Sequence, residues 1–205
     1  MTKGVIAMAI AFTAEEKDRI GRVLLDTAEK LFTTQGLKKT SLDELVGPAG
    51  IGKGSFYAFF DSKESLYLEV MLRRAPQVAA GVSAALAHPA GEENLIAVMR
   101  AITDVLVTDP LYRRLLTRPE ELDAVTRRVG PEQIARVTPQ LVTPLLDYLA
   151  AGQRDGVFVD DIAPETLVEV IRAVGLLVMH RDRFGPAHEQ VLEATIRTLA
   201  RGMLR

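Results

Sequence analysis

The sequence predicts an all-α fold, and three observations carry that prediction. Apolar residues recur at intervals of three and four, the helical period, over residues 15–35, 94–107 and 186–203. Several of the expected helices begin at a proline or at a capping residue, where helices usually start. No run of alternating apolar residues is long enough to indicate a sheet, and the chain contains no internal repeat. A chain of 205 residues suits one large or two small domains.

The first strong helix is expected over residues 15–35. Glutamates near its start suit the positive end of the helix dipole, and Gly36 followed by Leu37 is typical of a C-terminal glycine stop. One face of this helix is apolar and comprises Ile20, Leu24, Ala28, Leu31 and Phe32.

Two short helices around a glycine-rich turn follow. Ser41 and Glu44 form the sequence pattern of a capping box, and residues 47–50 (GPAG) supply the helix stop and the reversal. A second short helix is expected from Gly52 to Phe60, and a third from residue 61 or 62 to about residue 74. This arrangement is typical of a helix-turn-helix whose second helix recognises DNA.

The remaining segments are also predicted to be helical. Breaks are expected at Pro76 and Gly81 and in a loop near residues 88–92. The expected helices lie at 94–107, 110–116, 119–128 and 131–137, then from Pro139 or Pro144 to about 152, and at 164–179 and 186–203.

The segment around the turn resembles the signature of TetR-type transcriptional regulators. The resemblance spans roughly residues 15–70 and is carried by Thr40-Ser41, Gly50-Ile51, Lys53-Gly54, Tyr57, Phe60 and Lys63-Glu64. It implies a flexible arm over 1–14, a three-helix DNA-binding domain over 15–62, and an effector-binding and dimerisation domain over 63–205. Residues 63–75 are the expected connector. Gly52 and Phe59 depart from the family, which usually has a capping serine and a histidine there.

The predicted DNA-contacting residues follow from the helix-turn-helix and from the resemblance. They are Thr40, Ser41, Gly52, Lys53, Gly54, Ser55, Tyr57, Phe59 and Lys63. Lys53 and Ser55 would reach bases, while the resemblance implies a phosphate contact for Tyr57. Thr40 and Lys63 would hold phosphates at helix N-termini. Phe56 and Phe60 are expected to pack inside, whereas Phe59 is equally compatible with DNA and with the core.

The resemblance implies an effector pocket in the body. Its predicted lining residues are Met99, Ile102, Tyr112, Leu115, Leu116, Tyr148 and Met179. The apolar bias and the cluster of Arg113, Arg114 and Arg118 suit a hydrophobic or anionic ligand.

A homodimer is predicted from the last two long helices, because residues 164–179 are apolar nearly all round. The alternative is a central core helix of a monomer. The expected interface comprises Leu167, Val170, Ile171, Val174, Leu177, Val178, Val191, Leu192, Ile196, Leu199 and Met203.

A nucleotide-binding loop is the rival interpretation of residues 47–55. It fails because Gly54 separates Lys53 from Ser55, and because a helix cap precedes the loop instead of a strand. No catalytic pair, cofactor or metal site is predicted: the chain has no cysteine, and its histidines at 88, 180 and 188 are scattered. Glu120-Glu121 and Asp160-Asp161 suit solvated turns or helix starts.

The sequence therefore predicts a cytoplasmic, sequence-specific regulator that binds a palindromic double-stranded DNA operator as a dimer and is released by a ligand. The alternative is a helical small-molecule-binding module whose DNA reader has decayed. The net charge of −2 does not itself favour DNA, although residues 30–63 contain five lysines against three acids. The apolar run at 4–12 is too short for a membrane span and is expected to be an arm, or translation begins at Met8.

Overall fold

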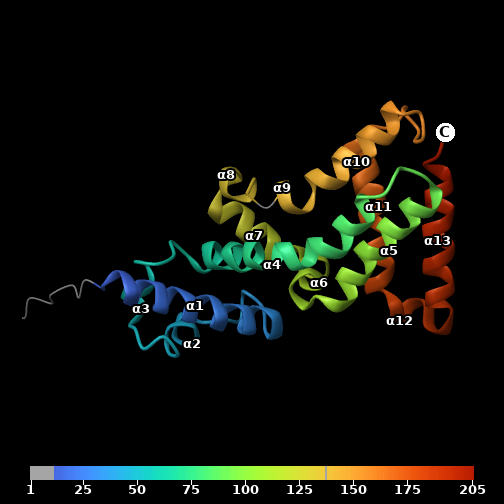
Figure 1. Cartoon of the computed structure of the whole chain (residues 1–205). Helices are drawn as coiled ribbons and strands as arrows, with labels where there is room; N and C mark the ends of the chain where they lie inside the picture. Colours follow the sequence, from blue (N-terminus) through green and yellow to red (C-terminus); the bar gives the residue numbers. More distant parts are fainter. Residues whose placement is uncertain (1–11, 137) are drawn as a thin grey trace, which may run out of the picture.

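A computed structural model describes residues 12–136 and 138–205, except for some side chains between residues 115 and 141. These residues are helical almost throughout, which confirms the predicted all-α class. Figure 1 shows an elongated molecule, with the first three helices at one end and the C-terminal helices at the other. The expected arm lies mostly outside the described residues.

The N-terminal head comprises α1 (Ala14–Thr34), α2 (Leu42–Val46) and α3 (Lys53–Phe56). Thr13 caps α1 in a reciprocal pair with Glu16, and the predicted apolar face of α1 is buried at every position except Leu31, which is half-buried. Gly36 adopts φ +85°, as expected for a glycine stop.

The second short helix ends earlier than predicted. The expected range reached Phe60, whereas the α-helix ends at Phe56. Beyond it, the amides of Ala58 and Phe59 donate to the carbonyls of Ser55 and Phe56, three residues back. This tighter turn aims the chain at the cap of the next helix.

The connector α4 (Lys63–Leu86) runs through Pro76 and Gly81, so the predicted break at these residues is wrong. Pro76 lies on the exposed side of α4, while Met71 and Ala75 are buried and α1, α5 and α7 pack along the helix. This packing outweighs the missing hydrogen bond at proline. The expected loop is present before α5 (Glu92–Thr108).

Prolines begin most of the middle helices: α6 (Pro110–Thr117), α7 (Pro119–Val129) and α8 (Pro131–Ile134). The last of these ends three residues before its predicted limit. The single helix expected from Pro139 or Pro144 is instead two, α9 (Thr138–Leu141) and α10 (Thr143–Arg154), which meet at Val142.

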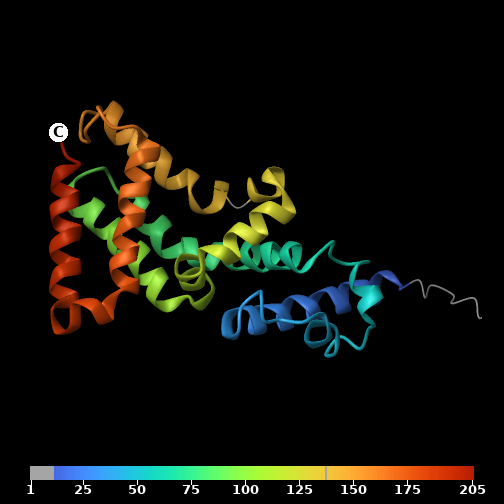
Figure 2. The same ribbon diagram turned by 180° about the vertical axis from the view of Figure 1, so that it is seen from behind.

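The C-terminal helices are α11 (Pro164–Met179), α12 (Arg181–Phe184) and α13 (His188–Gly202), with a 3-10 turn η1 (Gly185–Ala187) before α13. The predicted start of the last helix at Pro186 therefore falls in the 3-10 turn. From behind, α11 and α13 form the end of the body farthest from the head (Figure 2). Both helices pack on α5.

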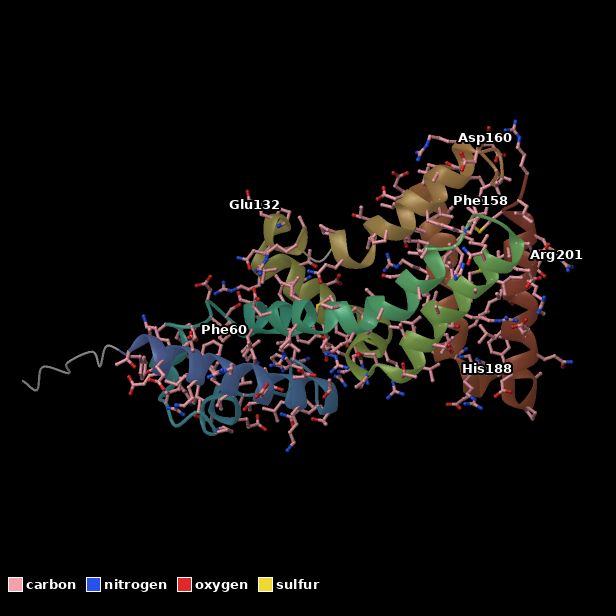
Figure 3. The ribbon with its side chains drawn as sticks, in the orientation of Figure 1. Phe60, Glu132, Phe158, Asp160, His188 and Arg201 are labelled. Carbon is pink, nitrogen blue, oxygen red and sulfur yellow. The ribbon has the colours of Figure 1, made fainter. Side chains whose placement is uncertain are left out.

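Two hydrophobic cores hold the chain. The first contains buried residues of α1–α4 and continues into α6 and α7 through Leu111, Tyr112 and Val125. The second lies between α5, α10, α11 and α13 and includes Leu95, Phe158 and Ile171, among others. In Figure 3, Phe60 lies by the head, whereas His188 and Arg201 mark α13 at the far end. The expected division at residue 62 stays a prediction, because α4 packs into both the head and the body.

Candidate nucleic-acid interface and effector cavity

The corner between α1 and α2 is fixed by internal hydrogen bonds. The Thr40 hydroxyl is buried and donates to the Gly36 carbonyl at 2.7 Å. The Lys63 ammonium donates to the carbonyls of Leu37 at 3.2 Å and Thr40 at 2.6 Å. Both side chains were predicted to hold phosphates, but in this state they bind the protein's own backbone and set the position of α2.

The N-terminus of α2 is closed by the predicted capping box. Ser41 Oγ accepts from the Glu44 amide at 3.3 Å, and the Glu44 carboxylate accepts from the Ser41 amide at 2.8 Å. A second donor, Gln35 Nε2, reaches Glu44 at 3.0 Å. These bonds, first the one from the Ser41 backbone, lower the pKa of Glu44 to about 2. Ser41 is thus a cap, and its hydroxyl is engaged within α2.

The exposed part of the predicted DNA set lies on α3 and the turn after it. Lys53 and Tyr57 are exposed, the latter by 57%, and Ser55 is half-buried. Gly52 and Gly54 face open space, since a Cβ built on either meets no atom within 4 Å. Gly52 also begins α3 without a side-chain cap. A flat face of this kind lets a helix approach the floor of the major groove.

Lys53 has a partner that the sequence did not suggest. Its ammonium lies 2.8 Å from the carboxylate of Asp43 on α2, and both side chains are largely exposed. Asp43 lies in the first turn of α2, where the sequence indicates only an acid that suits the positive end of the helix dipole. The pair sets the orientation of Lys53 in the free protein, and an exposed pair of this type opens at low cost.

The three phenylalanines of this segment pack inward. Phe56 is fully buried, and Phe60 lies 6.0 Å from it between ring centroids, as predicted for both. Phe59 was equally compatible with a DNA contact and with the core. Its side chain is half-buried, and its ring centroid lies 5.6 Å from that of Phe12. The aromatic ring that stands in for a family histidine therefore joins the head core. Tyr57 is held edge-on by Phe56 at 5.5 Å.

Comparisons with known proteins agree with this geometry. Residues 24–70 match the family described as bacterial regulatory proteins, tetR family. These residues form a DNA-binding domain of the TetR family. The chain is 25% identical over 144 residues to the uncharacterised regulator YhgD of Bacillus subtilis, covering 70% of this chain and 72% of that one.

Two further comparisons extend the likeness of this TetR-family chain. It is 28% identical over 134 residues to the transcriptional activator FasR of Mycolicibacterium smegmatis, covering 65% of this chain and 59% of FasR. The crystal structure of a TetR-family regulator from Shewanella sp. PV-4 superposes with a TM-score of 0.68 at 17% identity, covering 91% of this chain and 98% of that one. These matches identify the chain as a helix-turn-helix DNA-binding transcriptional regulator.

Ion pairs join the head of this TetR-family protein to its body. Arg74 on α4 contacts both Glu29 on α1 and Asp109, the residue that caps α6. Arg114 on α6 lies 2.7 Å from Glu121 on α7 and donates to the Gln35 carbonyl at the end of α1 at 3.4 Å. The arginines therefore couple α1, α4 and α6.

An apolar cavity of about 150 Å³ lies between α4, α5, α6, α9 and α10. Of the predicted effector-contacting residues, Ile102 and Tyr112 line it. The Tyr112 hydroxyl donates to the Met71 carbonyl at 3.4 Å, and burial raises its pKa. The cavity is lined by Val78, Ala79, Val82, Ser83, Leu86, Ile102, Val105, Leu106, Tyr112, Gln140, Pro144 and Leu145.

Three other predicted lining residues lie elsewhere. Met99 is buried in the second core, and Tyr148 lines an adjoining wider hollow. Met179 is half-buried near the end of α11 and is absent from the linings of both hollows. The side chains of Leu115 and Leu116 lie outside the described part of the structure.

The predicted dimer residues divide into two groups. The first is buried within the chain's own core and offers no surface to a partner: Leu167, Ile171, Val174, Ile196 and Met203. The second is half-exposed: Val170, Leu177, Val178, Val191, Leu192 and Leu199. Leu176, which the prediction omitted, is 48% exposed on the same helix as Val170.

Within residues 12–136 and 138–205, no group of three or more histidine or acidic side chains is placed to hold a metal ion. No helix in the same ranges is long and apolar enough to cross a membrane.

Proposed function

We propose that this protein is a ligand-relieved repressor that acts in the cytoplasm and binds a palindromic operator as a homodimer. The main support for this proposal is that α4 extends from the head into the body. Its first half packs in the head core through Leu66 and Met71, and its second half lines the cavity through Val82 and Leu86. One continuous helix thus touches both the DNA-reading head and the space for an effector.

Pro76 lies between these two halves of α4. Proline has no amide hydrogen, so the helix lacks one internal bond there and bends more readily than its neighbours. A ligand that contacts Val82 and Leu86 would displace the second half relative to the first. Release from DNA then requires that the ligand bind the non-binding arrangement more tightly than the DNA-binding one.

The palindrome follows from two-fold symmetry. Two recognition helices of a dimer would enter successive major grooves ~34 Å apart. The half-exposed apolar residues of α11 and α13, together with Leu176, provide a candidate interface.

The dimer is tested with two matched substitutions. Leu176→Glu should convert the protein to monomers in sedimentation experiments and weaken operator binding. Val107→Glu removes a comparably exposed apolar side chain from α5 and should leave the dimer intact. A dimer that survives Leu176→Glu with unchanged mass at micromolar concentration would contradict this interface.

Repression itself needs a separate test, since FasR is an activator. A promoter carrying the selected operator upstream of a reporter should be less active in cells that express the protein. Increased transcription would make the protein an activator.

The alternative function, a ligand-binding module without a DNA reader, is favoured by Phe59 packing inward and by Lys53 being paired with Asp43. It requires that the folded protein show no sequence preference on DNA.

A further inference from the structure

The apolar cavity opens into a second hollow of about 520 Å³. The two share Ser83, Leu86 and Pro144 in their linings and therefore adjoin each other. The inner part is walled almost entirely by apolar side chains. The outer part lies between the loop after α4 and the exposed side of α10. A single ligand can occupy both, with an apolar body inside and a polar end in the outer hollow.

The charges in the outer hollow have one sign. Asp147 lines it from α10, and Asp155, which caps the C-terminus of α10, lines it about two helical turns further along. Neither carboxylate has an ion pair or a side-chain hydrogen bond within the described part of the chain. Among the described residues, neither lining contains a lysine or arginine, and His88 is the one basic side chain present.

An aromatic ring completes the outer wall. Tyr148 is largely buried, its hydroxyl accepts from Asn94 at 3.0 Å, and its ring packs against Phe158 at 5.6 Å. Tyr148 therefore gives the outer hollow a fixed wall, and the unpaired carboxylates of its lining favour a cationic group.

We propose that the effector is an amphipathic cation, with an apolar body in the inner cavity and a positively charged end in the outer hollow that Asp147 and Asp155 line. This inference rests on the proposed function, which makes the cavity the effector site. It replaces the anionic alternative expected from the arginines of α6. Arg114 lines neither hollow and is paired with Glu121.

Calorimetric titration with two probes of equal chain length tests the charge preference. Decyltrimethylammonium and decyl sulfate, below their micellar concentrations and at pH 8, present the same apolar chain with opposite charge. The cation should bind about tenfold more tightly, since exposed charge contacts contribute about three- to fivefold each. Asp147→Asn combined with Asp155→Asn should bring the two affinities close together. Asp161→Asn, an exposed acid outside both linings, should preserve the difference.

A filled cavity provides the second control. Val82→Phe places a larger side chain in the inner cavity and should abolish binding of both probes if they use this site. Equal affinity for the two probes, a preference that survives the double substitution, or no binding at all would overturn the proposal.

Operator release is measured on the same samples and separates the two claims. Cation binding that loosens the operator complex supports both the ligand class and the repressor mechanism. Binding with the predicted charge preference and no effect on DNA keeps the ligand class but contradicts relief by ligand.

Discussion

The head and the body of this regulator are built in opposite ways. In the head, polar side chains such as Thr40, Glu44 and Lys63 are bound to specific backbone groups, and the phenylalanines pack against one another. In the body, the long helices α4 and α5 and the shorter α6, α9 and α10 surround a cavity, and the carboxylates of the outer hollow have no such partners in the described part of the chain. A DNA reader requires fixed geometry, whereas an effector site requires space and room to rearrange.

The largest effect is expected from a substitution in the core of the head. Phe56→Ala should lower the free energy of unfolding by about 3–5 kcal/mol, because the fully buried ring leaves a cavity in a close-packed core. Ile102→Ala, at the wall of an existing cavity, should cost clearly less. Urea denaturation of both variants checks the contrast. Equal losses would mean that the body is packed as tightly as the head.

The next effect concerns the junction of the two regions. Pro76→Ala should raise the free energy of unfolding by up to about 3 kcal/mol, because it restores a helix hydrogen bond and removes a clash. It should also weaken the response of DNA binding to an effector. Thermal unfolding and DNA titration with the cationic probe measure the two effects. A more stable variant with an unchanged response would exclude Pro76 as a point of bending.

A smaller effect is expected at the recognition face. Asp43→Asn should strengthen DNA binding about threefold and steepen its dependence on salt, because Lys53 loses its internal partner and the repulsion from phosphate falls. Asp18→Asn changes the same charge on an exposed position of α1 and serves as the control. DNA-binding titrations over a range of salt concentrations measure both effects. Identical affinity and salt dependence of the two variants would contradict the claim that Asp43 weakens DNA binding by pairing with Lys53.

The smallest effect is a pH dependence within the head. Glu44 has a pKa lowered to about 2 from 4.5, so its charged form stabilises the fold above pH 4.5, and that contribution is lost as the pH falls toward 2. Glu44→Gln should therefore be less stable than the parent at pH 7. The difference should shrink between pH 4.5 and 2. Urea midpoints at several pH values measure it, and a constant difference would contradict the assignment.

The contrast between the regions also explains what the sequence could predict. The capping box at Ser41, the glycine stop at Gly36 and the apolar face of α1 are local signals, and each is confirmed. The contact of Lys53 with Asp43, and that of Phe59 with Phe12, depend on how separate segments meet. No local pattern encodes these contacts.

In the body, two local signals did not determine the structure by themselves. Pro76 predicts a break, but packing along α4 maintains the helix. The nearly all-apolar α11 predicts burial on several sides, yet one chain covers only part of it and leaves Leu176 exposed. Among the predicted effector residues whose side chains the structure describes, only Ile102 and Tyr112 line the inner cavity, because a cavity wall and a filled core have the same composition.

Selection of a random double-stranded DNA library on the purified, folded protein tests the central claim most directly. We expect enrichment of a two-fold symmetric site. Lys53→Ala should lose discrimination at one position of each half-site, and Tyr57→Phe should weaken binding without a change in sequence preference. Absence of any enriched sequence at low salt, from protein with a cooperative unfolding transition, would contradict the assignment of α3 as a DNA-reading helix.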